Sequence, residues 1–275
     1  MKTTSSTKIE WVNIAPKKII VATPEEVNLH IPSDNSDRFL EPMVGVGSVA
    51  TTRNLLDGAM AAAKIAVNSD VVPPEMTPNR FVWQLAGAYQ ITHVVPPLMK
   101  QASERFASLN RHILSSWAFE KSQEEKGHDR LALLDLQSLG YRAEELVSSI
   151  VPRAATSLVD YFTRSVNDSD PIDCVGFTYA IERISLGTKE EHIQNIESLL
   201  PQGINATRCI RVHSAVGADA GHVDENVEMI AGLSAAERIR VVRACYETAL
   251  LIFSPPQEGY HSEAELENMF EPYKL

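Results

Sequence analysis

Cysteine is scarce in this chain. Only three occur among its 275 residues, Cys174, Cys209 and Cys245, and no two of them form a CxxC pair. A zinc knuckle or a dithiol redox site is therefore disfavoured, because both need closely spaced thiols. Isolated thiols of this kind are typical of a reducing compartment, so we expect a cytoplasmic protein.

Long apolar runs and an excess of positive charge are also missing. The N-terminal sequence MKTTSSTKIEWVN contains no apolar stretch typical of a signal peptide. No segment reaches the roughly 18 uninterrupted apolar residues of a membrane span. With 25 Lys and Arg against 36 Asp and Glu, the formal net charge is −11, whereas surfaces that bind nucleic acid or anionic membranes are rich in Lys and Arg. We therefore expect neither a nucleic-acid nor a membrane partner.

The remaining composition is that of an ordinary globular protein. Apolar residues make up 44% of the chain and charged residues 22%, and the length suffices for one sizeable domain with a full core. The first fifty residues differ, because TPEEVNLHIPSDNSDRFLEP is dense in turn formers and only KKIIVAT is typical of a short strand. We expect residues 1–50 to form an irregular arm, residues 51–255 a helical domain, and residues 256–275 a polar tail.

Helical patterns dominate residues 51–255. Apolar residues recur at spacings of three and four, and the connections are short, which predicts an all-α bundle of about seven to eight helices. The pair Pro96–Pro97 is predicted to stop or kink one helix, and Gly140 is predicted to follow the end of another. Ser234 and Glu237 have the spacing of a capping box. In such a bundle, chemistry is expected where polar side chains face inward between helices.

The stretch EEKGHDR, at residues 124–130, contains a carboxylate and an imidazole three residues apart. On a helix spanning residues 120–140, Glu125 and His128 would be offset by about 60° and would share a face. This is the Glu-x-x-His arrangement with which helical bundles hold iron or manganese. A solvated charged face is the alternative interpretation.

Glu182 lies among apolar neighbours in the sequence FTYAIERISLG. Burying a carboxylate in such a place is costly unless it is paired or bound to a metal ion. A salt bridge to Arg183 or another arginine is the alternative to a ligand role.

The segment RVHSAVGADAGHVDE carries His213, Asp219 and His222. Asp219 and His222 are three residues apart, so both can point to one place. His213 and His222 are nine apart, or about 900° on a straight helix, and would point to opposite sides. Either His213 is not a ligand, or the helix is broken or bulged between them, for which Gly217 and Gly221 offer the freedom.

His93 lies in the apolar sequence AGAYQITHVVPP. A single histidine on an apolar face is usually a hydrogen-bonded core residue, and a ligand role is the alternative. Taken together, these motifs put imidazoles and carboxylates on several predicted helices, which is the ligand type of non-heme iron. The lack of cysteine in the set disfavours an iron–sulfur cluster.

In this order and spacing, EEKGH, YAIE and the His…Asp-x-x-His segment resemble the heme-oxygenase-like diiron oxidases and oxygenases. LAGAYQITH resembles the first ligand helix of that family, and the resemblance covers roughly residues 81–253. It implies a heme-oxygenase-like helical fold, two iron ions as cofactor and O2 as co-substrate. Carried over by position, the implied metal ligands are His93, Glu125, His128, Glu182, His213, Asp219 and His222.

The chain departs from the family pattern at three places. His93 stands where the family usually has a glutamate. The third segment spaces as His-x5-Asp-x2-His, two residues longer than the usual His-x3-Asp-x2-His, which puts the role of His213 in question. Some members carry a further carboxylate where this chain has Lys121, so either Glu120 or Glu124 substitutes for it or this ligand is missing.

The resemblance implies an O2-dependent oxidation of a small carboxylic acid, with an amino acid favoured over a fatty acid. N-oxygenation, desaturation and oxidative C–C cleavage all occur in the family. Tyr179, Arg208 and Arg211 are the candidate substrate-binding residues, and a homodimer is expected by default. Two alternatives stay open: a metal-free, thiaminase-like hydrolase with Cys174 as nucleophile, and a helical binding protein.

Overall fold

The computed structural model describes the whole chain except residues 1–8, 46, 68–69, 215–219 and 258, and it does not describe the side chains of residues 220–222. The chain divides into two compact units, each built from several separate stretches. Unit 1 contains residues 1–68, 172–183 and 219–253, and unit 2 contains residues 69–171, 184–218 and 254–275. This division differs from the three consecutive regions that the sequence predicted.

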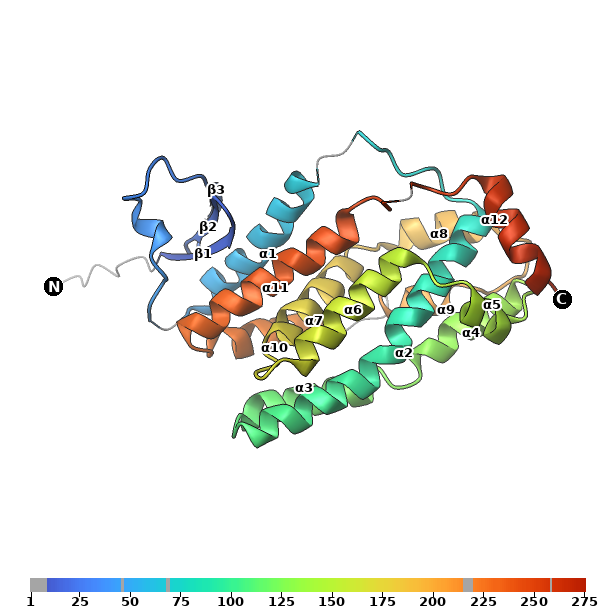
Figure 1. Cartoon of the computed structure of the whole chain (residues 1–275). Coiled ribbons are helices and arrows are strands. Elements are labelled where there is room, and N and C mark those ends of the chain that lie inside the picture. The colour runs from blue at the N-terminus through green and yellow to red at the C-terminus, as the bar shows by residue number, and fades with distance from the viewer. Residues whose placement is uncertain (1–8, 46, 68–69, 215–219, 258) are drawn as a thin grey trace. The chain divides into compact units, whose positions relative to one another are not determined.

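Unit 1 consists of a small sheet and helices. Its elements are β1 (Glu10–Ala15), β2 (Lys18–Ala22), β3 (Val27–His30), the 3-10 helix η1 (Arg38–Leu40), α1 (Val49–Ala66), most of α7 (Asp173–Ser185), α10 (Ala220–Ala231) and α11 (Ala235–Phe253). Helices α1 and α11 pack side by side along their length (Figure 1).

Unit 2 is helical in the part that the structure describes. Its elements are α2 (Pro78–Ser108), α3 (His112–Glu124), α4 (His128–Ser138), α5 (Ala143–Ser149), α6 (Arg153–Asn167), α8 (Glu190–Leu199), α9 (Arg208–Val212), α12 (Glu263–Phe270) and the 3-10 helix η2 (Glu271–Tyr273). Helix α2 packs against α3, α4 and α6. The core between α2, α4, α5 and α12 contains Phe81, Leu85, Leu136, Leu146 and Phe270.

The N-terminal region is not the irregular arm that the sequence predicted. Strands β1, β2 and β3 form an antiparallel sheet in that order. Alternate residues of β1 are buried, which is the pattern of a strand with one face on a core. Two residues, Pro16 and Lys17, connect β1 to β2, and Lys17 has a φ of 58°. The segment that resembled a strand, KKIIVAT, contains β2.

A buried ion pair joins this sheet to α11. The guanidinium of Arg238 has no exposed surface, and its Nη2 donates to Oε1 of Glu10 in β1 at 3.1 Å. Nη1 donates to the carbonyl of Leu233 at 2.7 Å. A buried charge is costly unless its partners are placed to bind it, so this pair fixes where the first strand lies on α11.

Helix α2 continues through Pro96–Pro97, so the helix does not stop there. Pro97 is exposed and Pro96 is half-buried, and each proline leaves one carbonyl of the preceding turn without its N–H partner. The helix begins with Thr77, whose side chain accepts from the N–H of Arg80. It ends before Asn110, a residue with a φ of 59°.

The expected long helix over residues 120–140 is interrupted. Helix α3 ends at Glu124, Gly127 has a φ of 91°, and α4 begins at His128. This break, together with short helices such as α5 and α9, explains why the described chain has more helices than the seven or eight predicted. Two predicted ends are confirmed: Gly140, with a φ of 86°, follows α4, and the Ser234–Glu237 capping box precedes α11.

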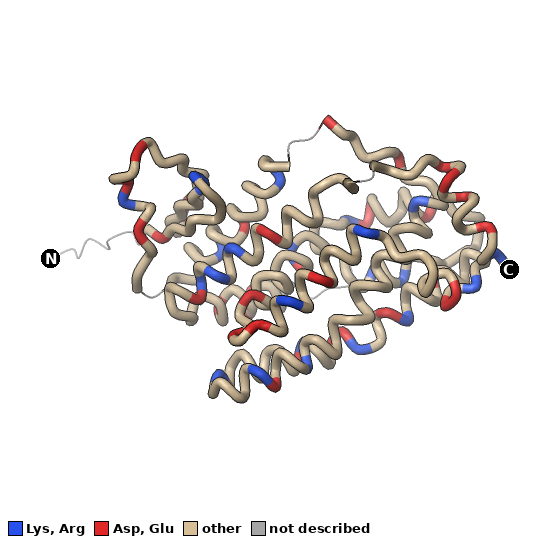
Figure 2. Tube along the Cα trace, in the orientation of Figure 1, with Lys and Arg blue, Asp and Glu red and all other residues tan. Residues whose placement is uncertain are grey.

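Acidic and basic residues are both distributed over the described parts of the two units (Figure 2). Among the described residues, no helix is both long enough and apolar enough to cross a membrane.

The close approach of α7 to α11 gives a test of unit 1. A Cβ added to Gly176 would lie 2.1 Å from the carbonyl oxygen of Val241 and 2.8 Å from the Cβ of Ala244. We expect Gly176→Ala to lower the free energy of unfolding by about 2–3 kcal/mol, because backbone must move to accept the methyl group. Gly87→Ala is the control, because its Cβ would meet no atom closer than 3.6 Å. It should raise stability by about 0.5–1 kcal/mol. Urea unfolding of both variants measures the difference; equal stabilities would contradict the packing.

Candidate metal centre

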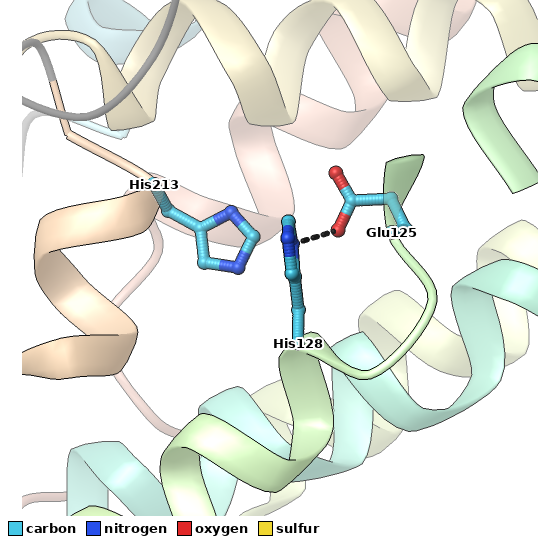
Figure 3. Close-up of side chains that lie close together, drawn as sticks. All are labelled: Glu125, His128 and His213. Atoms are coloured by element: carbon cyan, nitrogen blue, oxygen red, sulfur yellow. Dashed lines mark hydrogen bonds and ion pairs between the residues drawn. The ribbon is translucent and has the colours of Figure 1, made fainter. Parts of the chain in front are cut away.

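Glu125 and His128 face each other across the turn between α3 and α4. Glu125 is the last, capping residue of α3 and His128 is the first residue of α4. Oε2 of Glu125 lies 3.0 Å from Nδ1 of His128 (Figure 3). The two side chains therefore meet as the sequence predicted, but through a left-handed turn at Gly127 rather than along one helix face.

His213 completes a group of three donors in unit 2. It caps the C-terminus of α9, and its ring meets the ring of His128 edge to face, with centroids 4.9 Å apart (Figure 3). One donor atom from each of Glu125, His128 and His213 lies within 4.8 Å of the other two. Two ligands of one metal ion are about 3–4 Å apart when each bond is about 2.1 Å. The group is thus near the geometry of a metal site.

The electrostatics of the group match a place prepared for a cation. Burial raises the pKa of the Glu125 carboxyl, but the hydrogen bond from His128 and the two nearby imidazoles outweigh it and hold this pKa below its usual value. The hydrogen bond to Glu125 raises the pKa of His128 against the effect of burial. Burial lowers the pKa of His213. The surroundings therefore favour the charged form of Glu125 and the neutral form of His213.

Nε2 of His213 is buried and has no hydrogen-bond partner in the described structure. An unpaired buried nitrogen costs free energy, and a neutral imidazole nitrogen is also a common metal ligand. This atom is the clearest local sign of a missing ligand.

The structure shows a helix end between His213 and His222, which is one of the two alternatives that the spacing left open. His213 follows α9, whereas His222 belongs to α10, so the opposed directions calculated for one straight helix do not apply. Asp219 and Gly217 lie outside the described residues, and so does the side chain of His222. Their predicted roles stay predictions.

His93 is not the core histidine that the sequence suggested. Its side chain is 57% exposed, and its Nδ1 lies 2.8 Å from Oδ2 of Asp129. Its ring stacks on Tyr89. Asp129 directly follows His128. The start of α4 therefore provides one predicted metal ligand, His128, and the carboxylate that contacts another, His93 of α2.

Glu182 lies in unit 1 and is half-buried. Nδ2 of Asn226 in α10 donates to its Oε2 at 2.8 Å. Arg183 was the alternative partner of Glu182, but its Nε instead lies 3.2 Å from Oδ1 of Asp57 in α1. The buried hydroxyl of Tyr179, a candidate substrate residue, also donates to this Asp57 oxygen. Asp57, which binds both Tyr179 and Arg183, is not among the residues that the sequence predicted for the site.

The other two candidate substrate residues are engaged in ion pairs within unit 2. Nη1 of Arg208 lies 2.9 Å from Oδ1 of Asp135. Arg211 bridges Glu190 and Glu197 of α8, with each contact at 2.9 Å. A substrate carboxylate that used either arginine would compete with these partners. Glu124, one of the two carboxylates that could substitute at the Lys121 position, is itself paired with Lys121 at 2.8 Å.

Comparison with solved structures identifies the fold as heme oxygenase-like. One similar structure is a domain of unknown function with a heme oxygenase-like fold from Shewanella denitrificans, with a TM-score of 0.56 and 20% identity over 80% of this chain and 89% of that one. Another is a TenA homolog from Pseudomonas syringae pv. tomato, with a TM-score of 0.56 and 13% identity over 78% of this chain and 96% of that one. No protein-family model matches the chain, and no curated protein is detectably similar to it. The predicted fold class is thus confirmed, while the chemistry is left to the site.

The turn at Gly127 can be tested against a matched glycine. Gly127 and Gly140 have φ values of 91° and 86°, and a Cβ at either would meet no atom within 4 Å. Alanine at either position should therefore cost a similar 1–2 kcal/mol of stability through backbone strain alone. We expect Gly127→Ala also to weaken Co(II) binding at least tenfold, because only this turn sets the distance from Glu125 to His128. Titration followed by visible absorption measures the affinity.

Gly127→Asn should recover most of that affinity, since asparagine tolerates the left-handed region better than alanine does. Equal Co(II) affinities for Gly127→Ala and Gly140→Ala would contradict the role of this turn.

Proposed function

We propose that this protein is a non-heme iron enzyme that uses O2 to oxidise a small carboxylic acid, with an amino acid favoured as substrate. The observation that supports it best is the buried Nε2 of His213, which has no hydrogen-bond partner among the described residues and lies beside the Glu125–His128 pair. The heme oxygenase-like fold is compatible with such an enzyme and does not by itself select it.

The donor set fits iron. Two imidazoles and one carboxylate are the ligands of many non-heme iron sites, in which open coordination positions remain for O2 and substrate. Bound iron would supply the electrons and the open positions for O2 activation. The protein residues would do the rest: Glu125 contributes negative charge, His213 contributes a nitrogen already stripped of water, and His128 is oriented by its bond to Glu125.

A second iron ion is part of the proposal, as the resemblance to the diiron family implies. Glu182, Asp219 and His222 of unit 1 would be its ligands, and His93 stays a candidate metal ligand that the resemblance implies. Asn226 would orient Glu182 through the 2.8 Å hydrogen bond to its Oε2.

The three grouped ligands can be tested by substitution. We expect Glu125→Ala, His128→Ala and His213→Ala each to lose at least tenfold in affinity for Fe(II) under anaerobic conditions, because each removes one of three donors to one ion. O2 consumption with a panel of amino acids and fatty acids should fall to background. Circular dichroism should show that the helices persist. His192→Ala, an exposed change in α8, is the control.

The number of bound irons separates one ion from two. Wild-type protein loaded anaerobically should hold two Fe per chain, and Glu182→Ala should hold one. Full Fe(II) affinity and O2 consumption in both Glu125→Ala and His128→Ala would overturn the site.

A metal-free hydrolase of the same fold is the second candidate, favoured by the similarity to a TenA homolog. It needs a reactive thiolate, and Cys174 is the predicted nucleophile. Cys174 is fully buried. Burial raises the pKa of Cys209 to about 12 and raises that of Cys245, which makes these two thiols poor nucleophiles.

Cysteine substitutions distinguish the two candidates. We expect metal-stripped wild-type protein to hydrolyse no aminopyrimidine substrate, and Cys174→Ala to retain iron-dependent O2 consumption, because no thiol belongs to the proposed ligand set. Cys245→Ala, another buried thiol of unit 1, is the control. Metal-independent hydrolysis that is lost in Cys174→Ala and kept in Cys245→Ala would favour the hydrolase.

A further inference from the structure

We infer that Asp135 is a positioning residue that holds His213 at the metal site from inside α4. The inference rests on the proposed function, since it concerns how one of the proposed ligands is placed. Asp135 is no ligand itself and is absent from the predicted site residues.

The carboxylate of Asp135 is fully buried and binds the beginning of α9. Its Oδ2 accepts the backbone N–H of Cys209 at 2.8 Å, and its Oδ1 accepts the backbone N–H of Arg208 at 3.2 Å. Nη1 of Arg208 adds a third hydrogen bond at 2.9 Å. Arg208 and Cys209 are the first two residues of α9, whose N–H groups have no partner within the helix.

Asp135 therefore acts as an N-cap supplied by a different helix. The local N-cap residue, Thr207, makes no side-chain capping bond, because its hydroxyl donates to Glu197 instead. Helix α9 has five residues, too few to be stable without tertiary contacts. The position of α9, and of His213 directly after it, thus depends on such partners.

One face of α4 carries both contacts to the site. His128 and Asp135 are seven residues apart, which is two helical turns less about 20°, so they lie on nearly the same face. That helix packs against α9. His128 reaches the site directly, and Asp135 reaches it through the start of the helix that ends at His213. A single rigid helix thereby sets the spacing of two imidazoles.

Burial raises the pKa of Asp135, while its three hydrogen bonds favour the charged form. The ionised carboxylate is the form that can accept from all three donors. Asparagine keeps the size of the side chain but turns one acceptor into an NH2 group. In Asp135→Asn, an amide donor must therefore face an N–H donor of α9 or the Arg208 guanidinium.

The test measures Co(II) binding to the full-length protein by titration, followed by visible absorption. We expect Asp135→Asn to weaken Co(II) binding by 10- to 100-fold, as loss of a residue that orients a ligand commonly does. Hydrogen exchange at the amides of Arg208 and Cys209 should also accelerate at least tenfold without metal. Leu146→Ala, a core change in α5, should lower stability and leave both readouts unchanged.

The combination with His213→Ala separates positioning from general damage. If Asp135 acts through His213, Asp135→Asn should cause no further loss of Co(II) affinity in the His213→Ala background. A full additional loss in that background would overturn the inference. So would faster exchange in Asp135→Asn with unchanged Co(II) affinity, which leaves the proposed function standing. Unchanged Co(II) affinity in His213→Ala alone would instead overturn the proposed ligand set, and the inference with it.

Discussion

The candidate centre depends on a backbone constraint at Gly127. The sequence predicted a straight helix over residues 120–140, but the chain turns between Glu125 and His128. The left-handed residue ends α3 and starts α4 again at His128, and α4 then packs against α9. Glycine adopts this conformation without the steric cost that other residues meet. The contact between the Glu125 carboxylate and the His128 imidazole therefore depends on the turn at Gly127.

The second constraint is the dehydration of His213. Its Nε2 is buried and finds no hydrogen-bond partner in the part of the chain that the structure describes, and an arrangement of that kind has to be stabilised by its surroundings. Ion pairs and hydrogen bonds hold α9 from two sides, through Asp135 of α4 and through the glutamates of α8. The free energy that this scaffold supplies can keep an imidazole poised for a ligand, which is the usual relation between a site and its support.

Several parts of the fold could be predicted because their signals are local. The capping box at Ser234 and Glu237 and the glycine after α4 depend on neighbours within a few residues, and both were found as expected. Of the three strands at residues 10–30, only β2 was predicted, because a short strand becomes recognisable only when it pairs. The continuation of α2 past Pro96–Pro97 was not predicted, because the contacts of α2 with α3, α4 and α6 that support the helix join residues distant in the sequence.

The sequence alone determined that the chain is mainly helical, that its polar residues include imidazoles and carboxylates at ligand spacing, and that Glu125 and His128 belong together. These conclusions follow from the helical periodicity and from contacts between residues three or four positions apart in the sequence. Tertiary structure alone decided that His213 joins them, that His93 pairs with Asp129, and that a buried Asp135 holds α9. Each of those contacts joins residues more than thirty positions apart, and their meeting depends on how α2, α4 and α9 pack rather than on any local pattern.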